Sequence, residues 1–94
     1  MADPMDIQER SEGAYLAGDL VRDADGKAYL VTWTNQLPSG ELLDTLAVLA
    51  LRDDLETVYD YLDIEVSKVV DLVPGYLSFD DARRSFWTYI AANM

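Results

Sequence analysis

The chain has 94 residues, with 18 acidic and 7 basic side chains, no histidine, no cysteine and a net charge of −11. This length suits one domain, and a hydrophobic content of 50% is enough for a folded core, which argues against wholesale disorder. The missing residue types exclude Cys/His zinc sites, thiol nucleophiles, disulfides and histidine acid–base catalysis.

The N-terminal residues 1–12 combine a helix-start signal with few apolar side chains. Asp3 followed by Pro4 is typical of a helix start, but only Met5 and Ile7 offer apolar contacts. These residues are therefore expected to form either a short helix or a frayed tail. They lack the basic and apolar regions of a signal peptide, and no run is long enough to cross a bilayer, so we expect a cytoplasmic protein.

Two strands joined by a tight turn are predicted for residues 14–22 and 28–36. They flank residues 23–26, whose sequence is Asp-Ala-Asp-Gly. Asp-Gly between β-rich runs is a strong hairpin signal, because glycine adopts the positive φ that the turn requires. The same four residues do not fit a calcium loop, since a loop with Gly26 at its sixth position would begin at Val21, which is not a ligand.

Residues 42–51 are predicted to form a third, buried strand after a Pro-Ser-Gly turn at 38–40. The run from Leu46 to Leu51 is apolar on every side, so periodicity does not distinguish a strand from a helix, and its leucines and alanines favour a helix. A helix-start signal follows immediately at Asp53. A preceding helix would leave no room for a connection there, whereas a strand needs none, so the strand is preferred.

Two or three helices are predicted for the rest of the chain. Residues 53–63 begin with an aspartate cap and carry apolar side chains at helical spacing. Residues 64–72 are expected to form a further short helix, with a strand as the alternative because β-branched residues are frequent there. Ser78, with Asp81 three residues later, is predicted to cap a last helix over 79–92. The apolar side chains expected to be buried by this helix are Phe79, Ala82, Phe86, Tyr89 and Ile90.

Together these elements predict a single α+β domain over residues 1–94. The helices would pack on one face of a small three-stranded antiparallel meander. The opposite face of the sheet is expected to contact solvent.

The negative charge is concentrated in residues 1–26 and 53–72, and this distribution is the main functional signal. In the predicted helix over 53–63, four carboxylates follow a 3-4-3 spacing and would line one side. Like charges at this spacing destabilise a helix by about 0.2–0.5 kcal/mol per pair, which suggests a cationic partner outside the chain. The four residues are Asp53, Glu56, Asp60 and Asp63.

We therefore expect a non-enzymatic protein, without cofactor or metal, that presents carboxylates to a basic, nucleic-acid-binding surface of another protein. Four charges along one helix are sparser than the phosphates of a duplex, so imitation of nucleic acid would also need the acids of the first block or a homodimer. Direct binding to nucleic acid or to anionic membranes is disfavoured by the charge. The further expected contact residues are Asp19, Asp23, Asp25, Tyr61 and Trp87.

In size, acidity and lack of histidine and cysteine, the chain resembles phage-encoded anti-restriction and anti-CRISPR inhibitors. This resemblance implies an inhibitor that fills the DNA or RNA channel of a nuclease, repressor or CRISPR-type complex. One alternative is an adaptor, subunit or phage structural protein that binds through an apolar surface, with acidity serving solubility or high-salt adaptation. Another is a small hydrolase or transferase, which would need paired carboxylates in a deep pocket.

Two arginines on the last predicted helix offer a weaker signal. Asp80 lies three and four residues before Arg83 and Arg84, the favourable order for ion pairs on a helix. Trp87 lies four residues after Arg83, and we expect it either to stack on that arginine or to mark a contact surface.

Overall fold

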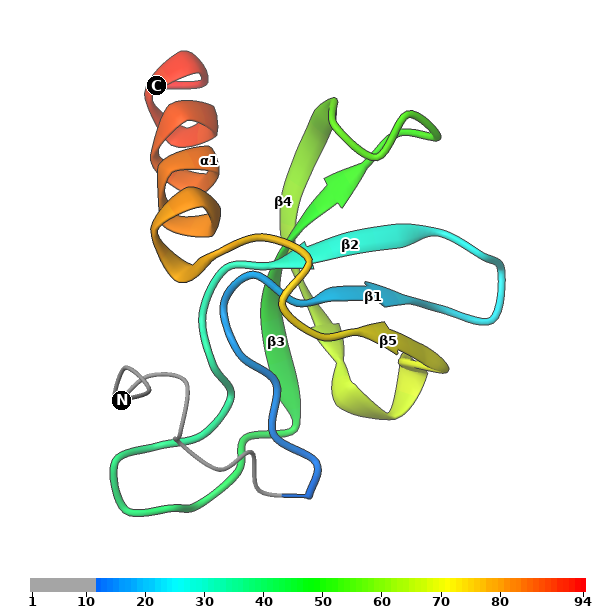
Figure 1. Ribbon diagram of the computed structural model, residues 1–94, viewed down its shortest axis with the longest axis vertical. Coiled ribbons are helices and arrows are strands. Elements are labelled where there is room, and N and C mark those ends of the chain that lie inside the picture. The colour runs from blue at the N-terminus through cyan, green and yellow to red at the C-terminus, as the bar shows by residue number, and fades with distance from the viewer. Residues whose placement is uncertain (1–11) are drawn as a thin grey trace, which may run out of the picture.

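The computed structural model describes residues 12–94 and contains a five-stranded antiparallel sheet with a C-terminal α-helix (Figure 1). The strand order in the sheet is β4-β3-β2-β1-β5. The elements are β1 (Leu20–Arg22), β2 (Ala28–Val31), β3 (Thr45–Leu51), β4 (Val58–Glu65), the 3₁₀ helix η1 (Val66–Lys68), β5 (Asp71–Val73) and α1 (Phe79–Ala92). The helix or tail predicted for residues 1–12 lies outside the described residues, apart from Glu12. No helix in residues 12–94 has the length and apolar character needed to cross a bilayer.

The predicted first hairpin is confirmed. β1 and β2 pair antiparallel, with Leu20 opposite Leu30. Asp23 closes the turn between them, because its Oδ1 accepts hydrogen bonds from the backbone N–H groups of Asp25 and Lys27, at 2.9 and 3.0 Å. Both strands are shorter than the predicted 14–22 and 28–36, since the outer parts of those ranges form loops.

The buried strand predicted within residues 42–51 is observed as β3, although the reason for preferring a strand, a helix starting at Asp53, is wrong. Val48 and Leu49 point to opposite faces of the sheet, and both are fully buried. A strand covered on both faces needs apolar residues at every position, so the run carries no alternation.

The helix predicted over 53–63 is wrong. Its N-terminal half is a turn in which Asp54 accepts hydrogen bonds from the backbone N–H groups of Glu56 and Thr57, and its C-terminal half is β4. β4 pairs with β3 from Thr45 opposite Glu65 to Leu51 opposite Val58, with an irregularity beside Ala50. Aromatic and β-branched residues favour a strand here, because their side chains pack well on a pleated surface.

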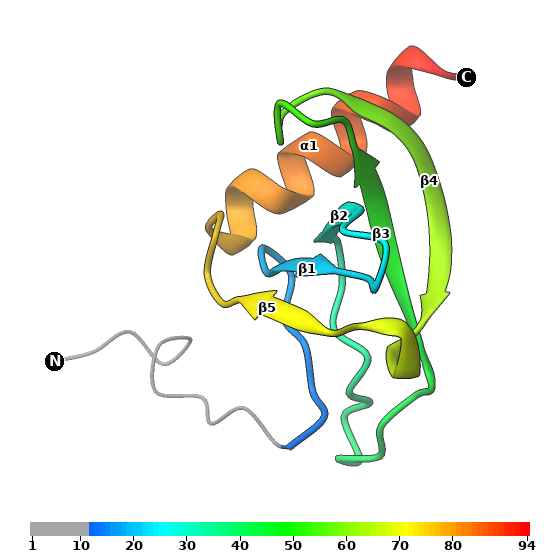
Figure 2. The ribbon, with the colours of Figure 1, turned by 90° about the vertical axis from the view of Figure 1, so that its right-hand side faces the viewer.

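The helix predicted over 64–72 is also wrong, and with it the three-stranded meander. η1 is a single 3₁₀ turn, and β5 follows it and pairs with β1, with Val21 opposite Leu72. β4 and β5 are therefore the two edges of one sheet, joined through η1. Figure 2 shows β4 arching away from α1 towards η1, so that the sheet curls round towards its other edge.

Apolar side chains cover both faces of the sheet, so the expected solvent-exposed face is not observed. One core cluster is built on Val21, Val31 and Val48, with residues of β4, η1 and β5 packed against it. The second is built on Leu20, Leu30 and Leu49, and Phe86 and Tyr89 of α1 pack against it.

The predicted last helix is confirmed over residues 79–92. Ser78 is its N-cap, and the Ser78 side chain accepts a hydrogen bond from the Asp81 N–H at 3.1 Å. Ala82 is the one residue of α1 that is fully buried, and the larger apolar side chains of the expected buried face remain partly or largely exposed. α1 therefore lies on the sheet without being enclosed by it.

Candidate functional site

The four carboxylates of the predicted helical stripe are exposed, but they do not share one face of an element. Asp53 and Glu56 belong to the turn between β3 and β4. Asp60 and Asp63 lie on β4, opposite Ala50 and Ala47 of β3. Because side chains alternate along a strand, residues three apart point to opposite faces of the sheet. The four carboxylates would line one side only if this segment were a helix, and it is a turn followed by a strand.

Asp19 is 1% exposed, and its carboxylate serves the fold. Its two oxygens accept hydrogen bonds from the backbone N–H groups of Leu16 and Gly75, at 2.9 and 3.1 Å, and so tie two distant loops together.

Of the two carboxylates in the first hairpin, Asp23 stabilises the turn and Asp25 is exposed. Asp23 accepts hydrogen bonds from the turn and from the Tyr29 hydroxyl at 3.0 Å. Burial alone would raise the pKa of Asp23, but these hydrogen bonds outweigh it and lower the pKa below 3.8. The same pairing acts on Tyr29, where burial first and then Asp23 raise the hydroxyl pKa to about 12. Asp25 is exposed at the tip of the hairpin.

Tyr61 and Trp87, the two aromatic residues expected to contact a partner, come together around Phe86. The Tyr61 and Phe86 rings meet edge to face with centroids 5.1 Å apart, and Phe86 meets Trp87 in the same way at 5.0 Å. Edge-to-face contacts of this length are favourable beyond the apolar area that they bury. The three rings thus join β4 to α1.

Arg83 extends this group to the end of β2. Its guanidinium donates a hydrogen bond to the Thr32 carbonyl at 2.8 Å. It also lies 4.8 Å from the Trp33 ring, 4.7 Å from the Phe86 ring and 5.8 Å from the Trp87 ring. This geometry allows cation–π attraction to all three. The expected stacking of Trp87 on Arg83 is observed, whereas the expected pairing with Asp80 is replaced by an ion pair between Arg84 and Asp81 at 3.3 Å.

These side chains form a continuous surface, here named the aromatic–arginine surface. Trp33 is 50% exposed and Trp87 58%, while Phe79 packs against Trp33 with centroids 5.6 Å apart. Large aromatic rings left half in water around an arginine are typical of protein contact sites. Its members are Trp33, Tyr61, Phe79, Arg83, Phe86 and Trp87.

Sequence reasoning missed Trp33 and misplaced Phe79. The sequence predicts Trp33 within a strand and Phe79 on the buried face of the last helix. The turn of the chain after Val31 and the shallow docking of α1 leave both rings exposed, and neither feature has a local sequence signal. Within residues 12–94, no three side chains of the metal-binding types come together.

No known protein family, curated protein or solved structure matches this chain.

Proposed function

We propose that this protein is a non-enzymatic binding module that docks onto a basic protein through the aromatic–arginine surface. The observation that carries the proposal is the exposure of the Trp33 and Trp87 indoles, both close to the half-buried Arg83. Trp, Tyr and Arg dominate the binding free energy of many protein interfaces. Exposed indoles cost hydrophobic free energy that a partner recovers by covering them.

The surface is held in place before any partner binds. The hydrogen bond from Arg83 to Thr32 and the contacts with three rings fix the guanidinium. The edge-to-face contacts of Phe86 in turn restrict Tyr61 and Trp87. Binding therefore loses little side-chain entropy at these positions, which favours affinity.

Charge complementarity argues for a basic partner. Asp80 and Asp81 follow Phe79 in the first turn of α1, and Asp63, two residues after Tyr61 on β4, points to the same face as Tyr61, so exposed carboxylates lie on the side of the aromatic rings. A net charge of −11 would speed association with a cationic surface, and this acceleration would weaken as the salt concentration increases. Nucleic-acid-binding proteins are a partner class with such surfaces.

The geometry favours an aromatic anchor over imitation of a phosphate backbone. Imitation needs closely spaced carboxylates on one face, whereas Asp53 and Glu56 lie in a turn and Asp60 and Asp63 point to opposite faces of β4. The acids then contribute the rate and selectivity of binding, and the rings contribute the affinity.

The experiment compares three forms of the immobilised protein in a lysate of the source organism, with captured proteins quantified by mass spectrometry. Trp87→Ser removes an anchor, and Val70→Ser changes a side chain that is 64% exposed and outside the surface. A basic protein captured by the parent and by Val70→Ser, but about tenfold less by Trp87→Ser, is the expected result. Its affinity for the purified forms is then measured by titration.

A second pair of variants separates charge from anchor. Asp80→Asn with Asp81→Asn should slow association several-fold and leave dissociation nearly unchanged, because charges outside the anchor act mainly on encounter. The proposal is overturned if capture depends on the carboxylates of residues 53–63 and not on Trp33 or Trp87. It is equally overturned if every captured protein binds Trp87→Ser as well as the parent.

A further inference from the structure

The outer side of β4 is a row of backbone hydrogen-bonding groups beside which the described part of the chain places no strand. β4 is the last strand on its side of the sheet, and in Figure 2 it runs along the outside of the molecule. It is eight residues long, whereas β5, the opposite edge of the sheet, has three. A long edge strand is a template on which an extended segment of another chain can pair.

The register determines which backbone groups of β4 point outward. The Val66 N–H, directly after β4, donates to the Asp44 carbonyl at 2.8 Å. Because antiparallel pairing alternates, the even-numbered residues at this end of β4 bond to β3, and the odd-numbered residues direct their N–H and C=O groups away from it. The outward residues are Tyr61, Asp63 and Glu65.

An aspartate already occupies one outward donor on each edge of the sheet. On β4, the Asp60 Oδ1 accepts a hydrogen bond from the Tyr61 N–H at 2.9 Å. On β5, the Asp71 Oδ1 accepts one from the N–H of Leu72, the middle residue of that strand, also at 2.9 Å. The edge of β5 is therefore covered at its centre, while β4 continues beyond Tyr61 with further outward groups.

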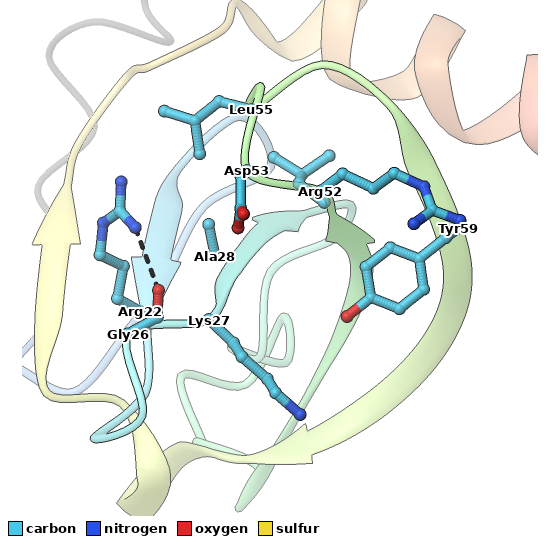
Figure 3. A pocket seen from close by; sticks show the side chains of 9 residues that line it. Arg22, Gly26, Lys27, Ala28, Arg52, Asp53, Leu55 and Tyr59 are labelled. Carbon is cyan, nitrogen blue, oxygen red and sulfur yellow. Dashed lines mark hydrogen bonds between the residues drawn. The ribbon is translucent and has the colours of Figure 1, made fainter.

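The first residues of β4 are less suited to pairing than its last residues. The register with β3 is irregular beside Ala50, and Tyr59 lies next to Arg52, whose guanidinium is 5.3 Å from the centre of the ring (Figure 3). An irregularity of this kind disrupts the regular spacing of edge groups that a further strand needs. The regular part is residues 61–65, here named the open edge.

The open edge is acidic. Asp63 and Glu65 are both exposed, and their side chains point to the same face of the sheet as Tyr61. Within residues 12–94 neither carboxylate forms an ion pair, even with Lys68 of η1. The two residues with outward N–H groups beyond Tyr61 thus also carry uncompensated negative charge.

We infer that the open edge binds an extended segment of the basic partner as an additional antiparallel strand. This inference rests on the proposed function, because it names the part of that partner which the protein recognises. The residues opposite Asp63 and Glu65 would carry lysine or arginine, since side chains of directly opposed residues share a face and opposite charges there attract. A second copy of this chain would place carboxylates against carboxylates, so the charges of the open edge select a cationic segment over self-pairing.

The probe is the synthetic peptide acetyl-Lys-Val-Lys-Val-Lys-Val-Lys-amide, and the readout is amide hydrogen exchange of the full chain, followed by NMR at low salt. In the free protein, exchange should be slow at Leu62 and Ile64, which bond to β3, and fast at Asp63 and Glu65. The peptide at saturation should slow exchange at Asp63 and Glu65 about tenfold, with a dissociation constant below about 10 mM.

Two modified peptides test the backbone pairing without a change to the protein. The lysines opposite Asp63 and Glu65 direct their own N–H groups at β4, so N-methylation of every lysine should weaken binding more than about tenfold. N-methylation of the valines, whose N–H groups point away from β4, should alter binding less than about threefold. In the protein, Glu65→Gln should weaken binding several-fold, whereas Glu41→Gln, the same change in an exposed loop, should alter it less than about twofold.

Unchanged exchange at Asp63 and Glu65 would overturn the inference. Equal binding of the two methylated peptides would also overturn it, because it would indicate attraction to an acidic surface without strand pairing. Trp87→Ser, which tests the proposed function, should leave the protection by the peptide within about twofold of the parent. Absence of this protection, with capture of a basic protein still dependent on Trp87, would reject the open edge and retain the proposed function.

Discussion

At Gly18 the backbone approaches the segment before α1 more closely than any side chain would allow. A Cβ on this residue would lie 2.1 Å from the Leu77 carbonyl oxygen, and φ is +101°. The Gly18 carbonyl also accepts a hydrogen bond from the Leu77 N–H at 2.9 Å. This contact fixes the start of β1 to the segment that leads into the helix.

Gly18→Ala should therefore destabilise the protein far more than an alanine at another glycine with positive φ. Gly26, at φ = +81°, has no atom within 4 Å of the added Cβ and serves as the control. Urea unfolding should show a loss of about 3 kcal/mol or more for Gly18→Ala, and about 1–2 kcal/mol for Gly26→Ala, which bears only the backbone strain. Equal stability of the two variants would contradict the close contact.

Two buried polar residues hold distant loops together. Asp19 and Asn35 are both nearly fully buried. The Asn35 side chain accepts from the Tyr15 N–H and donates to the Gly13 and Leu43 carbonyls. The sequence places both residues in predicted strands and Asp19 among the expected contact residues. It shows no sign of their structural role, because their partners lie up to 56 residues away and depend on the whole fold.

At the scale of elements, the same local signal led to one correct and one wrong prediction. Ser78 and Asp81 cap α1 as expected. The aspartates before β4 carry a similar signal, but Asp54 bonds to the next N–H groups in a hairpin turn. A side chain that accepts from backbone two or three residues later is compatible with either structure. The residues that follow decide, and here their β-branched and aromatic side chains pair with β3.

This turn has a measurable pH signature. The Thr57 hydroxyl and the N–H groups of Thr57 and Glu56 all donate to Asp54, and they lower its pKa from 3.8 to about 2. Because the folded-state pKa lies below the unfolded one, the stabilisation is fully present above pH 3.8 and is lost as the pH falls through about 2.

Thr57→Val removes the hydroxyl donor and should raise the Asp54 pKa towards 3.8, as measured by carboxyl-carbon NMR titration. Thr57→Ser retains the donor and should keep the low value. An unchanged pKa in Thr57→Val would show that the backbone N–H groups alone stabilise the carboxylate.

At the scale of the whole molecule, the topology determines which charges share a surface. The first hairpin and α1 follow from local patterns, but the pairing of β5 with β1 joins segments some 50 residues apart and has no such pattern. The change from helix to strand at residues 58–65 also moves alternate carboxylates to opposite faces. The acidity of the protein can be read from the sequence, while the arrangement of its acids depends on the strand at Val58–Glu65, where helical spacing of the apolar residues wrongly predicted a helix.

The charge of the whole molecule also affects how its aromatic–arginine surface behaves in solution. Two copies, each with a charge of −11, repel one another, and this repulsion opposes contact between their exposed indoles. Raising NaCl from about 0.1 M to about 1 M shortens the screening length from about 10 Å to about 3 Å and removes most of the repulsion. Sedimentation should therefore show monomers at low salt and increasing self-association at high salt. The double variant Trp33→Ser, Trp87→Ser should stay monomeric at both salt concentrations. Without the indoles, reduced charge repulsion does not lead to association, because no exposed apolar rings remain to make contact. Equal self-association of the parent and the double variant would show that the copies associate through a different surface of the molecule.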